Sequence, residues 1–378
     1  MSVTQQSEVP VLIGGKWTMP VVQAYNDVHN PSTGETIART PICAAADVDK
    51  AVQAAKRAFP AWANTPAPTR AAVMFKYRQL VTDHLEELAR LVTRENGKTL
   101  DEARGDVKRG LEVVELSCGI GHLLKGEVVP QVAEQIDGVT SREPIGVCAG
   151  IAPFNFPAMV PMWMYPLAIA CGNTFLLKPS EKTPLTAARL AELFVEAGLP
   201  DGVLNIVHGG REVVDALCTH PDIVAISFIG SSAVAKHVYT LGTAHDKRVQ
   251  AGGGAKNVLV VMPDADPEPT LRAIMGSAYG CAGQRCMAGS LLAGVGEAAD
   301  GLQRRVLEAI DKLKIGNTYD DPTAQMGPVI DEAARNRIRQ YIDAGINEGA
   351  TLVRDGRQLK MERGYFVGPT LFDNVKPT

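Results

Sequence analysis

The sequence VCAGIAPFNFPAMVPMWMYPLAIACGNTFLLK, residues 147–178, decides the fold class of this chain. It begins with a short apolar run, residues 147–151, which predicts a buried strand. A proline-containing loop leads into the apolar segment 158–170, which predicts a helix, and residues 175–178 predict a second strand. Because a helix separates the two strands, we expect them to lie parallel in one sheet.

The same strand-then-helix pattern continues toward the C-terminus. A helix is predicted over 184–197, after the second strand. Two further strands are predicted over 204–207 and 223–229, and each is followed by a predicted helix, 212–218 and 231–241. Four such units in a row predict an α/β fold, with a parallel sheet covered by helices on both faces. Ligands bind at the carboxyl ends of the strands in such sheets, so the candidate residues are sought in the loops that follow them.

The residues before residue 145 predict a different organisation. Short strands joined by a turn are expected within residues 12–40, and helices are expected over 47–59, 68–94 and 100–124. Residues 126–139 alternate between polar and apolar side chains and predict an exposed hairpin, a feature that often serves as an arm between subunits.

A glycine cluster, Gly252 to Gly254, interrupts the α/β pattern and marks a predicted domain boundary. The 378 residues exceed the size at which one core stops growing, so two domains are expected, residues 1–251 and 252–378. Residues 126–142 are predicted to form an oligomerisation arm of the first domain. The second domain is expected to begin with a strand at Asn257 and a helix over 266–279, and a strand is predicted over 365–372.

Composition narrows the class of protein. Hydrophobic residues make up 46% and charged residues 21%, which is typical of a soluble globular protein. The net charge of −4 gives no reason to expect nucleic acid or an anionic membrane as a partner. The seven cysteines are irregularly spaced, and no signal peptide is visible, so reduced thiols and a cytoplasmic location are expected. The histidines and cysteines form no metal-ligand pattern, so no metal is expected.

Two motifs carry candidate catalytic residues. Cys286 stands on a Gly-containing loop beside Arg285, a cation that would favour the reactive thiolate; the alternative is a buried structural cysteine. Asn155, in Pro-Phe-Asn-Phe-Pro, directly follows the first parallel strand, where its amide could donate to an oxyanion; the alternative is an ordinary turn residue.

Two other motifs carry candidate cofactor-binding residues. Glu181, in Leu-Lys-Pro-Ser-Glu after the second strand, could hold ribose hydroxyls, although a solvated helix start is the plain alternative. Gly230 and Ser231 follow the fourth strand and open a helix, where a glycine lets the backbone approach a phosphate. The Gly-x-Gly-x-x-Gly fingerprint, a complete Walker A loop and the Gly-x-Ser-x-Gly elbow of serine hydrolases are all missing from the sequence.

In this order and approximate spacing, the four motifs resemble those of the aldehyde dehydrogenase superfamily, over nearly the whole chain. The resemblance implies a parallel Rossmann-like NAD domain, an α/β catalytic domain and an oligomerisation hairpin. It implies that Cys286 is the nucleophile and that Asn155, with the Cys286 backbone N–H, forms the oxyanion hole. The positions that resemble the family's NAD-binding residues are Ala152, Phe154, Lys178, Glu181, Lys182, Gly230 and Ser231. Glu181 would disfavour a 2′-phosphate, so NAD is expected rather than NADP.

Within the superfamily, the sequence is similar to the methylmalonate-semialdehyde dehydrogenases, which acylate coenzyme A. The runs 154–164, 207–210 and 283–287 carry this similarity. Hydrolytic members have a glutamate in a Glu-Leu-Gly-Gly-Lys motif that activates water, and Gly252 stands at that position here. Glycine cannot act as a base, whereas a thiol, with a pKa of about 8.5, needs less help than water. We therefore expect coenzyme A as the co-substrate.

The resemblance implies oxidation of malonate or methylmalonate semialdehyde with decarboxylation, giving acetyl- or propionyl-CoA, carbon dioxide and NADH. A substrate carboxylate calls for a cation, for which Arg285 is the first candidate and Arg109 the second; the alternative for Arg109 is a solvated helix face. A hydrolytic aldehyde dehydrogenase that makes a free acid and a truncated, non-catalytic NAD-binding fragment are the other interpretations. The chain ends at Pro377-Thr378, before the family's C-terminal motifs, so an incomplete catalytic domain is expected, and the full-length protein is expected to form a homodimer or homotetramer.

Overall fold

The computed structural model describes residues 7–376, which form two compact units. Unit 1 takes the described residues up to Asp27 together with Ala38–Leu88 and Gly105–Gly253. Unit 2 takes Val28–Ile37, Ala89–Arg104 and the described residues from Gly254 onward. Two segments from the first third of the chain therefore belong to the same unit as the C-terminal part. The predictions that concern the first six residues and the end at Pro377-Thr378 lie outside the described residues.

Unit 1 is built on a seven-stranded sheet with the spatial order β11-β10-β7-β8-β9-β1-β2. The strands are β1 Val11–Ile13, β2 Lys16–Thr18, β7 Val147–Ile151, β8 Thr174–Lys178, β9 Leu204–Ile206, β10 Ile223–Gly230 and β11 Arg248–Gly253. Strands β7 to β11 pair in parallel, whereas β1 pairs antiparallel with both β9 and β2. The predicted α/β fold with a parallel sheet is confirmed.

Helices cover the two faces of this sheet because the parallel strands are apolar on both sides. Every residue of β7 and β8 is buried, as expected for strands inside a parallel sheet. Leu176 of β8 packs into a core with Val52 of α1 and Val213 of α8. The neighbouring Phe175 points to the opposite face, where it contacts the ring of Tyr165. Among the helices of unit 1 are α1 Ala45–Ala63, α2 Ala67–Asp83, α6 Met159–Ala170, α7 Leu185–Glu196, α8 Arg211–Thr219 and α9 Ser232–Thr243.

The order of the parallel strands creates a switch point beside β7. Its neighbour on one side is β8, the next strand in the chain, and on the other side β10, the fourth parallel strand. The connections on the two sides therefore run in opposite directions, and such a point leaves a crevice at the carboxyl ends of the strands. The loop after β7, which contains Asn155, and the Gly230-Ser231 turn after β10 lie at this edge of the sheet.

Three predicted elements differ from the structure. The helix predicted over residues 68–94 is two helices, α2 and α3 Leu85–Asn96, because His84 leaves the helical conformation. The helix predicted over 100–124 ends at Cys118 as α4 Leu100–Cys118, and Gly119 separates it from the short α5 Ile120–Leu123. Only Leu371–Asp373, strand β15, forms from the strand predicted over 365–372, since Pro369 has no backbone N–H to donate.

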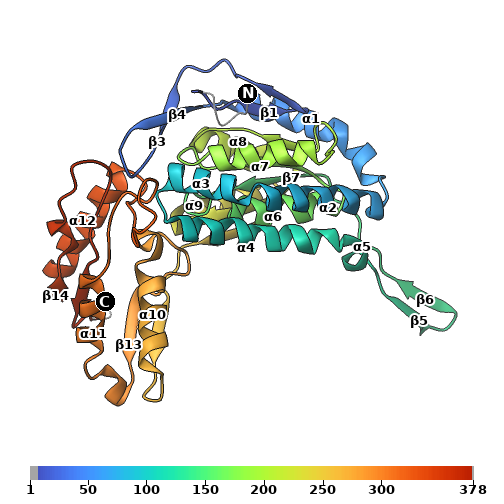
Figure 1. Ribbon diagram of the computed structural model, residues 1–378. Coiled ribbons are helices and arrows are strands. Elements are labelled where there is room, and N and C mark those ends of the chain that lie inside the picture. The colour runs from blue at the N-terminus through green and yellow to red at the C-terminus, as the bar shows by residue number, and fades with distance from the viewer. Residues whose placement is uncertain (1–6, 377–378) are drawn as a thin grey trace. The chain divides into compact units, whose positions relative to one another are not determined.

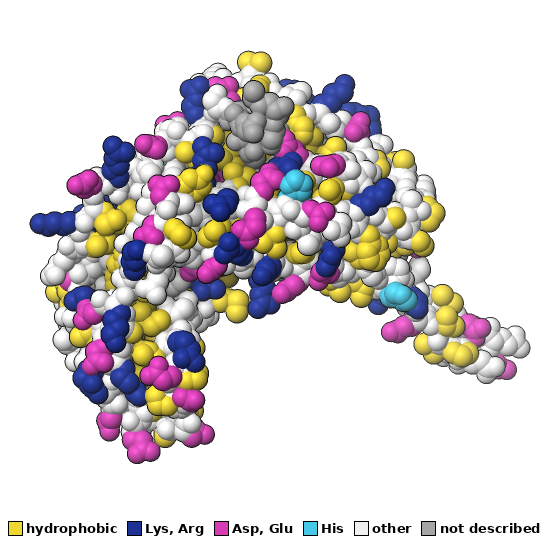
Figure 2. Space-filling model, in the orientation of Figure 1, with side chains coloured by type: hydrophobic (Ala, Val, Ile, Leu, Met, Phe, Trp, Pro, Cys, Tyr) yellow, Lys and Arg dark blue, Asp and Glu magenta, His cyan; other side chains and the backbone are white. Residues whose placement is uncertain are grey.

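The predicted hairpin is present as β5 Val128–Ala133 and β6 Ile136–Val139. It projects away from the helices of unit 1 (Figure 1), and its apolar side chains face outward (Figure 2). Val128, Val132 and Val139 are all more than 60% exposed. Its role as an oligomerisation arm stays a prediction.

Unit 2 contains smaller sheets around its own core. Its elements beyond Gly254 include β12 Val258–Val261 and β13 Leu291–Gly294, a parallel pair, and β14 Thr351–Arg354 and β15, an antiparallel pair. They also include the helices α10 Pro267–Ala278, α11 Leu302–Asp311 and α12 Glu332–Asn347. Strands β3 Tyr25–His29 and β4 Thr36–Pro41 pair with each other near the start of the chain. Val261, Ile274 and Val306 join β12, α10 and α11 in one apolar cluster. None of the described helices combines the length and the apolar character that crossing a membrane requires.

Candidate active site

The loops after β7 and β8 are held together at the carboxyl edge of the sheet. The backbone N–H of Ala152 donates to the carbonyl of Lys178 at 3.0 Å, which extends the β7–β8 pairing by one residue. The hydroxyl of Thr183 donates to the carbonyl of Phe154 at 3.3 Å. The Lys182 ammonium lies 5.6 Å from the centre of the Phe154 ring, within the range of a cation–π contact. Four of the predicted cofactor-binding residues are therefore neighbours.

Lys178 and Glu181 form an ion pair inside this neighbourhood. The Lys178 Nζ and the Glu181 Oε2 are 3.1 Å apart, and the Lys178 side chain is only 6% exposed. Burial by itself would raise the pKa of Glu181, but the attraction of Lys178 and a backbone hydrogen bond outweigh it and hold that pKa below its usual value of 4.5. The hydroxyl of Thr40 also donates to the Glu181 carbonyl at 3.0 Å, which fixes the backbone of this residue. The site thus presents an ionised carboxylate in a fixed position.

The turn after β10 has the properties of an anion-binding helix N-terminus. Ser231 precedes the first turn of α9, and its side chain makes no capping hydrogen bond in the part of the chain described. A Cβ on Gly230 would lie 2.5 Å from the Phe228 ring, so this position has no room for a side chain. A Cβ on Gly253 would lie 2.5 Å from Ala235 Cβ, so the end of β11 packs closely against the same helix. Backbone N–H groups at such a turn are well suited to a phosphate.

Asn155 lies half-buried between β7 and α6. The buried carboxylate of Asp106 accepts a hydrogen bond of 2.7 Å from the backbone N–H of Met159, the first residue of α6. This bond satisfies a donor at the helix N-terminus and fixes the far end of the loop that carries Asn155. Asn155 belongs to unit 1 and Cys286 to unit 2.

Cys286 is the exposed cysteine among the seven of this chain, all of which lie in the described part. Four of the others are buried, and burial raises the pKa of Cys43 to about 11 and that of Cys148 to about 12. Buried thiols of this kind are unreactive. Of the two interpretations weighed for Cys286, the exposed side chain favours a reactive thiol over a structural one.

The loop that carries Cys286 starts in an unusual backbone conformation. Cys281, Ala282 and Gly283 have φ angles of +51°, +53° and +76°, and the two non-glycine residues each cost about 1–3 kcal/mol in this left-handed region. Polar contacts from other segments hold the loop. The side-chain amide of Asn257 donates to the carbonyl of Cys286 at 2.9 Å, and the Gln284 side chain accepts from the Ile330 N–H at 3.0 Å.

The two candidate arginines have different surroundings. The Arg285 Nη1 donates to the carbonyl of Gly276, near the end of α10, at 2.9 Å, and the residue is otherwise exposed beside Cys286. Arg109 forms an ion pair of 3.1 Å with Glu112 on the same face of α4, and its side chain is 67% exposed. Arg109 thus has the features of a solvated helix face, whereas Arg285 is anchored by one nitrogen and keeps the rest of its guanidinium at the surface.

Gly252 lies in the edge strand β11, opposite Ile229. A Cβ at this position would lie 3.7 Å from the Phe228 carbonyl oxygen and 3.8 Å from Ile229 Cγ1, which are ordinary contact distances. Space therefore does not explain why this position has no side chain.

Three residues of the nucleophile loop's surroundings were not predicted: Glu102, Asn257 and Gln284. Glu102 accepts from the Cys281 N–H at 2.7 Å, across 179 residues of sequence. The pattern Thr99-x-x-Glu102 is a recognisable capping box, but nothing in the sequence indicates the second contact. The described residues contain no group of three metal-ligating side chains.

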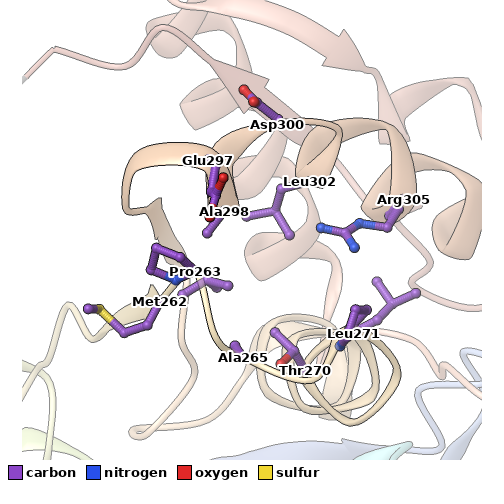
Figure 3. Close-up of a pocket in the computed structure, with 12 residues that line it drawn as sticks. Met262, Pro263, Ala265, Thr270, Leu271, Glu297, Ala298, Asp300, Leu302 and Arg305 are labelled. Carbon is purple, nitrogen blue, oxygen red and sulfur yellow. The ribbon is translucent and has the colours of Figure 1, made fainter.

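A cavity of about 250 Å³ lies elsewhere in unit 2, beside the first turns of α10 and α11 (Figure 3). Its lining includes the apolar residues Val261, Leu271 and Leu302 and the charged residues Glu297, Asp300 and Arg305. None of the predicted site residues lines it, so it carries no part of the proposed chemistry.

Comparisons with known proteins cover nearly the whole chain. Residues 17–378 match the model of the aldehyde dehydrogenase family. A malonate-semialdehyde dehydrogenase of Halalkalibacterium halodurans is 54% identical over 364 residues, which are 96% of this chain and 75% of that protein. Two solved structures have TM-scores of 0.95 and cover 98% of this chain and 76% of theirs. They are a methylmalonate-semialdehyde dehydrogenase from Oceanimonas doudoroffii, at 44% identity, and a protein from Sinorhizobium meliloti assigned the same activity and complexed with NAD, at 47% identity.

Proposed function

Since the chain belongs to the aldehyde dehydrogenase family, we propose that it oxidises malonate or methylmalonate semialdehyde with NAD and transfers the acyl group to coenzyme A. The products are acetyl-CoA or propionyl-CoA, carbon dioxide and NADH. Relatives that carry these two activity names match 96–98% of the chain at 44–54% identity, which supports this choice of substrates.

The carboxyl edge of the unit 1 sheet fits NAD. The ionised Glu181 provides acceptors for the hydroxyls of a ribose, and a 2′-phosphate at the same place would be repelled. The open N-terminus of α9 at Ser231, with Gly230 before it, provides backbone donors for the pyrophosphate. Four further residues of the proposed NAD site lie at the same edge of the sheet because of the contacts described above: Ala152, Phe154, Lys178 and Lys182. The cofactor supplies the hydride acceptor for the oxidation.

Cys286 is the nucleophile in this proposal. Its thiolate adds to the aldehyde carbon, and the oxyanion of the resulting thiohemiacetal accepts hydrogen bonds from the Asn155 amide and the Cys286 backbone N–H. Loss of hydride from the same carbon leaves a thioester on Cys286. A carboxylate β to the thioester carbonyl can then leave as carbon dioxide, since the carbonyl accepts the electron pair, and the α-carbon of the resulting enolate takes a proton from solvent. The thiolate of coenzyme A finally attacks the thioester carbonyl and frees Cys286.

Arg285 is the proposed partner of the substrate carboxylate. A guanidinium binds a carboxylate with two parallel hydrogen bonds, and Arg285 is the exposed cation next to the nucleophile in the sequence. Its Nη1 is fixed by the Gly276 carbonyl, so the group is oriented before substrate arrives. Arg109, which is paired with Glu112, is the second choice.

The proposal that the acyl group goes to coenzyme A rather than to water depends on the glycine at position 252. A hydrolytic enzyme needs a base there to activate water, and general base catalysis contributes about 10²–10⁴-fold. The position accepts a side chain without displacing its neighbours, yet it holds none. A thioester on Cys286 is therefore slow to hydrolyse and reacts with a thiol.

The test follows NADH formation from NAD and malonate semialdehyde, with and without coenzyme A, and identifies the acyl product by mass spectrometry. We expect a single-turnover burst without coenzyme A and continuous turnover to acetyl-CoA with it. Continuous turnover to a free acid without coenzyme A would favour the hydrolytic interpretation instead. No NADH and no aldehyde-dependent loss of the Cys286 thiol would favour a non-catalytic NAD-binding fragment.

A further inference from the structure

Glu102 contacts the nucleophile loop and its own helix with the two oxygens of one carboxylate. Its Oε2 accepts from the Thr99 N–H at 2.9 Å, and the Thr99 hydroxyl accepts from the Glu102 N–H at 3.3 Å. These two bonds form a capping box at the start of α4. Its Oε1 accepts from the Cys281 N–H at 2.7 Å. The rigid end of a helix is thus joined directly to the strained turn that leads to Cys286.

The same carboxylate lies close to the Arg285 side chain. A Cβ on Gly280 would be 3.1 Å from the Glu102 Oε1 and 2.7 Å from the Arg285 Nη1, so both groups converge on this glycine. The negative charge of Glu102 therefore favours the position in which Arg285 donates to the Gly276 carbonyl. One carboxylate faces the first residue of the left-handed turn and the cation that precedes the nucleophile.

A left-handed turn with two non-glycine residues persists only where its surroundings hold it. The Cys281 N–H is the first donor of that turn, and a charge-assisted hydrogen bond is stronger than a neutral one. Without this acceptor, Cys281 and Ala282 would relax toward ordinary backbone conformations and carry the following residues with them. The position of the Cys286 thiol and of its own N–H would change as a result.

From these contacts we propose that Glu102 is a positioning residue, which fixes the Cys281–Cys286 turn and orients Arg285 so that the nucleophile and its cation are set before substrate binds. The proposal rests on the assignment of Cys286 as the nucleophile. Glu102 itself does not touch the reacting atoms in this proposal. It acts through the backbone of the loop.

The test compares Glu102→Ala with Thr99→Ala in the full chain. Both changes remove part of the capping box, but only Glu102→Ala removes the acceptor of the Cys281 N–H. Hydrogen exchange of the peptide that spans residues 280–289 is the first measurement, because it requires no activity. We expect Glu102→Ala to increase exchange in this peptide at least about tenfold, because a part-buried, charge-assisted hydrogen bond is lost, and Thr99→Ala to leave it unchanged. Equal exchange in the two variants would overturn the proposal.

The second measurement is the burst of NADH with saturating aldehyde. A positioning role predicts that Glu102→Ala lowers the burst rate constant at least tenfold and keeps its amplitude, because each folded molecule still carries one nucleophile. A merely structural role would lower the amplitude and leave the rate constant of the folded fraction unchanged, as expected for Thr99→Ala. Glu102→Gln, which keeps an oxygen acceptor for Cys281, should recover part of the rate constant.

The two proposals fail in different ways. If the parent chain gives no burst, the proposed function is wrong, while the exchange of residues 280–289 still decides the role of Glu102. If the parent gives a burst and Glu102→Ala gives the same rate constant, the role of Glu102 is wrong and the proposed function stands. Asp101→Asn serves as a further control, since Asp101 is on the same helix turn but is 90% exposed and pairs with Arg104.

Discussion

Replacing Gly252 with glutamate should convert acyl transfer to coenzyme A into hydrolysis. The structure allows this change at low cost, since the nearest atoms to a new Cβ are 3.7 and 3.8 Å away and the residue is not among the glycines with positive φ. Gly252 is exposed and lies in an edge strand, where substitutions usually change the free energy of unfolding by no more than about 0.5 kcal/mol. Loss of folding should therefore not obscure the result.

The expected gain follows from the role of a general base. Such a base contributes about 10²–10⁴-fold, so turnover without coenzyme A should rise at least about 100-fold in Gly252→Glu. A factor of 100 corresponds to about 2.7 kcal/mol of the activation barrier. The assay measures steady-state NADH formation and the free acid without coenzyme A, over a series of aldehyde concentrations.

Gly252→Gln is the matched control, because glutamine has nearly the same size and no basic oxygen of comparable strength. It should leave the slow hydrolysis of the parent chain unchanged. If both variants fold and show the NADH burst, yet Gly252→Glu releases free acid no faster than Gly252→Gln, then the residue at position 252 does not decide between hydrolysis and acyl transfer.

Three further predictions concern the cofactor, pH and stability. Glu181→Gln should weaken NAD binding at least about tenfold in calorimetric titration, because a hydrogen bond to a charged group is worth about 1.5–3 kcal/mol; unchanged affinity would contradict the ribose assignment. Burial lowers the pKa of His208 from 6.5 to about 4, so the unfolded chain binds this proton first as the pH falls. The stability that the neutral His208 contributes is complete above pH 6.5, and the free energy of unfolding should decrease by about 3 kcal/mol between pH 6.5 and 4. The Tm of His208→Gln should decrease less than that of the parent chain over that range. An equal decrease in the two proteins would contradict this role of His208. Tyr77→Phe should lower the free energy of unfolding by about 1–3 kcal/mol in urea titrations, since it leaves the buried Tyr165 hydroxyl without its partner, and a change below 0.5 kcal/mol, near the usual effect of a surface substitution, would show that this bond contributes little.

The strand-and-helix pattern of residues 147–243 could be predicted because its strands are buried on both faces. A continuous apolar run such as Val147–Ile151 is informative by itself. Strand β11, Arg248–Gly253, was not predicted, because it contains Arg248, Gln250 and two glycines and exists through its pairing with β10. Pairing with a distant partner overrides weak local preference at the edge of a sheet.

The sequence predicted the types of residue in the candidate site better than it predicted the contacts between them. The four motifs supplied Asn155, Glu181, Ser231 and Cys286, and the structure brings the Glu181 and Lys178 side chains to 3.1 Å. Sequence did not indicate that Arg285 donates to the Gly276 carbonyl. Glu181 is three positions after Lys178, so a local turn is enough to join them, whereas Arg285 folds back on a helix that precedes its loop.

The sequence by itself determined the family, the nucleotide-binding type of sheet and the order of the chemical groups along the chain. The family follows from the resemblance of four ordered motifs, and the type of sheet follows from local features, namely apolar periodicity and the residue types at strand ends. Only the tertiary structure decided that residues 89–104 belong to the unit that carries Cys286 and that Glu102 accepts from Cys281. The two residues are 179 positions apart, and the hydrogen bond between them depends on how whole helices pack, which no local pattern records.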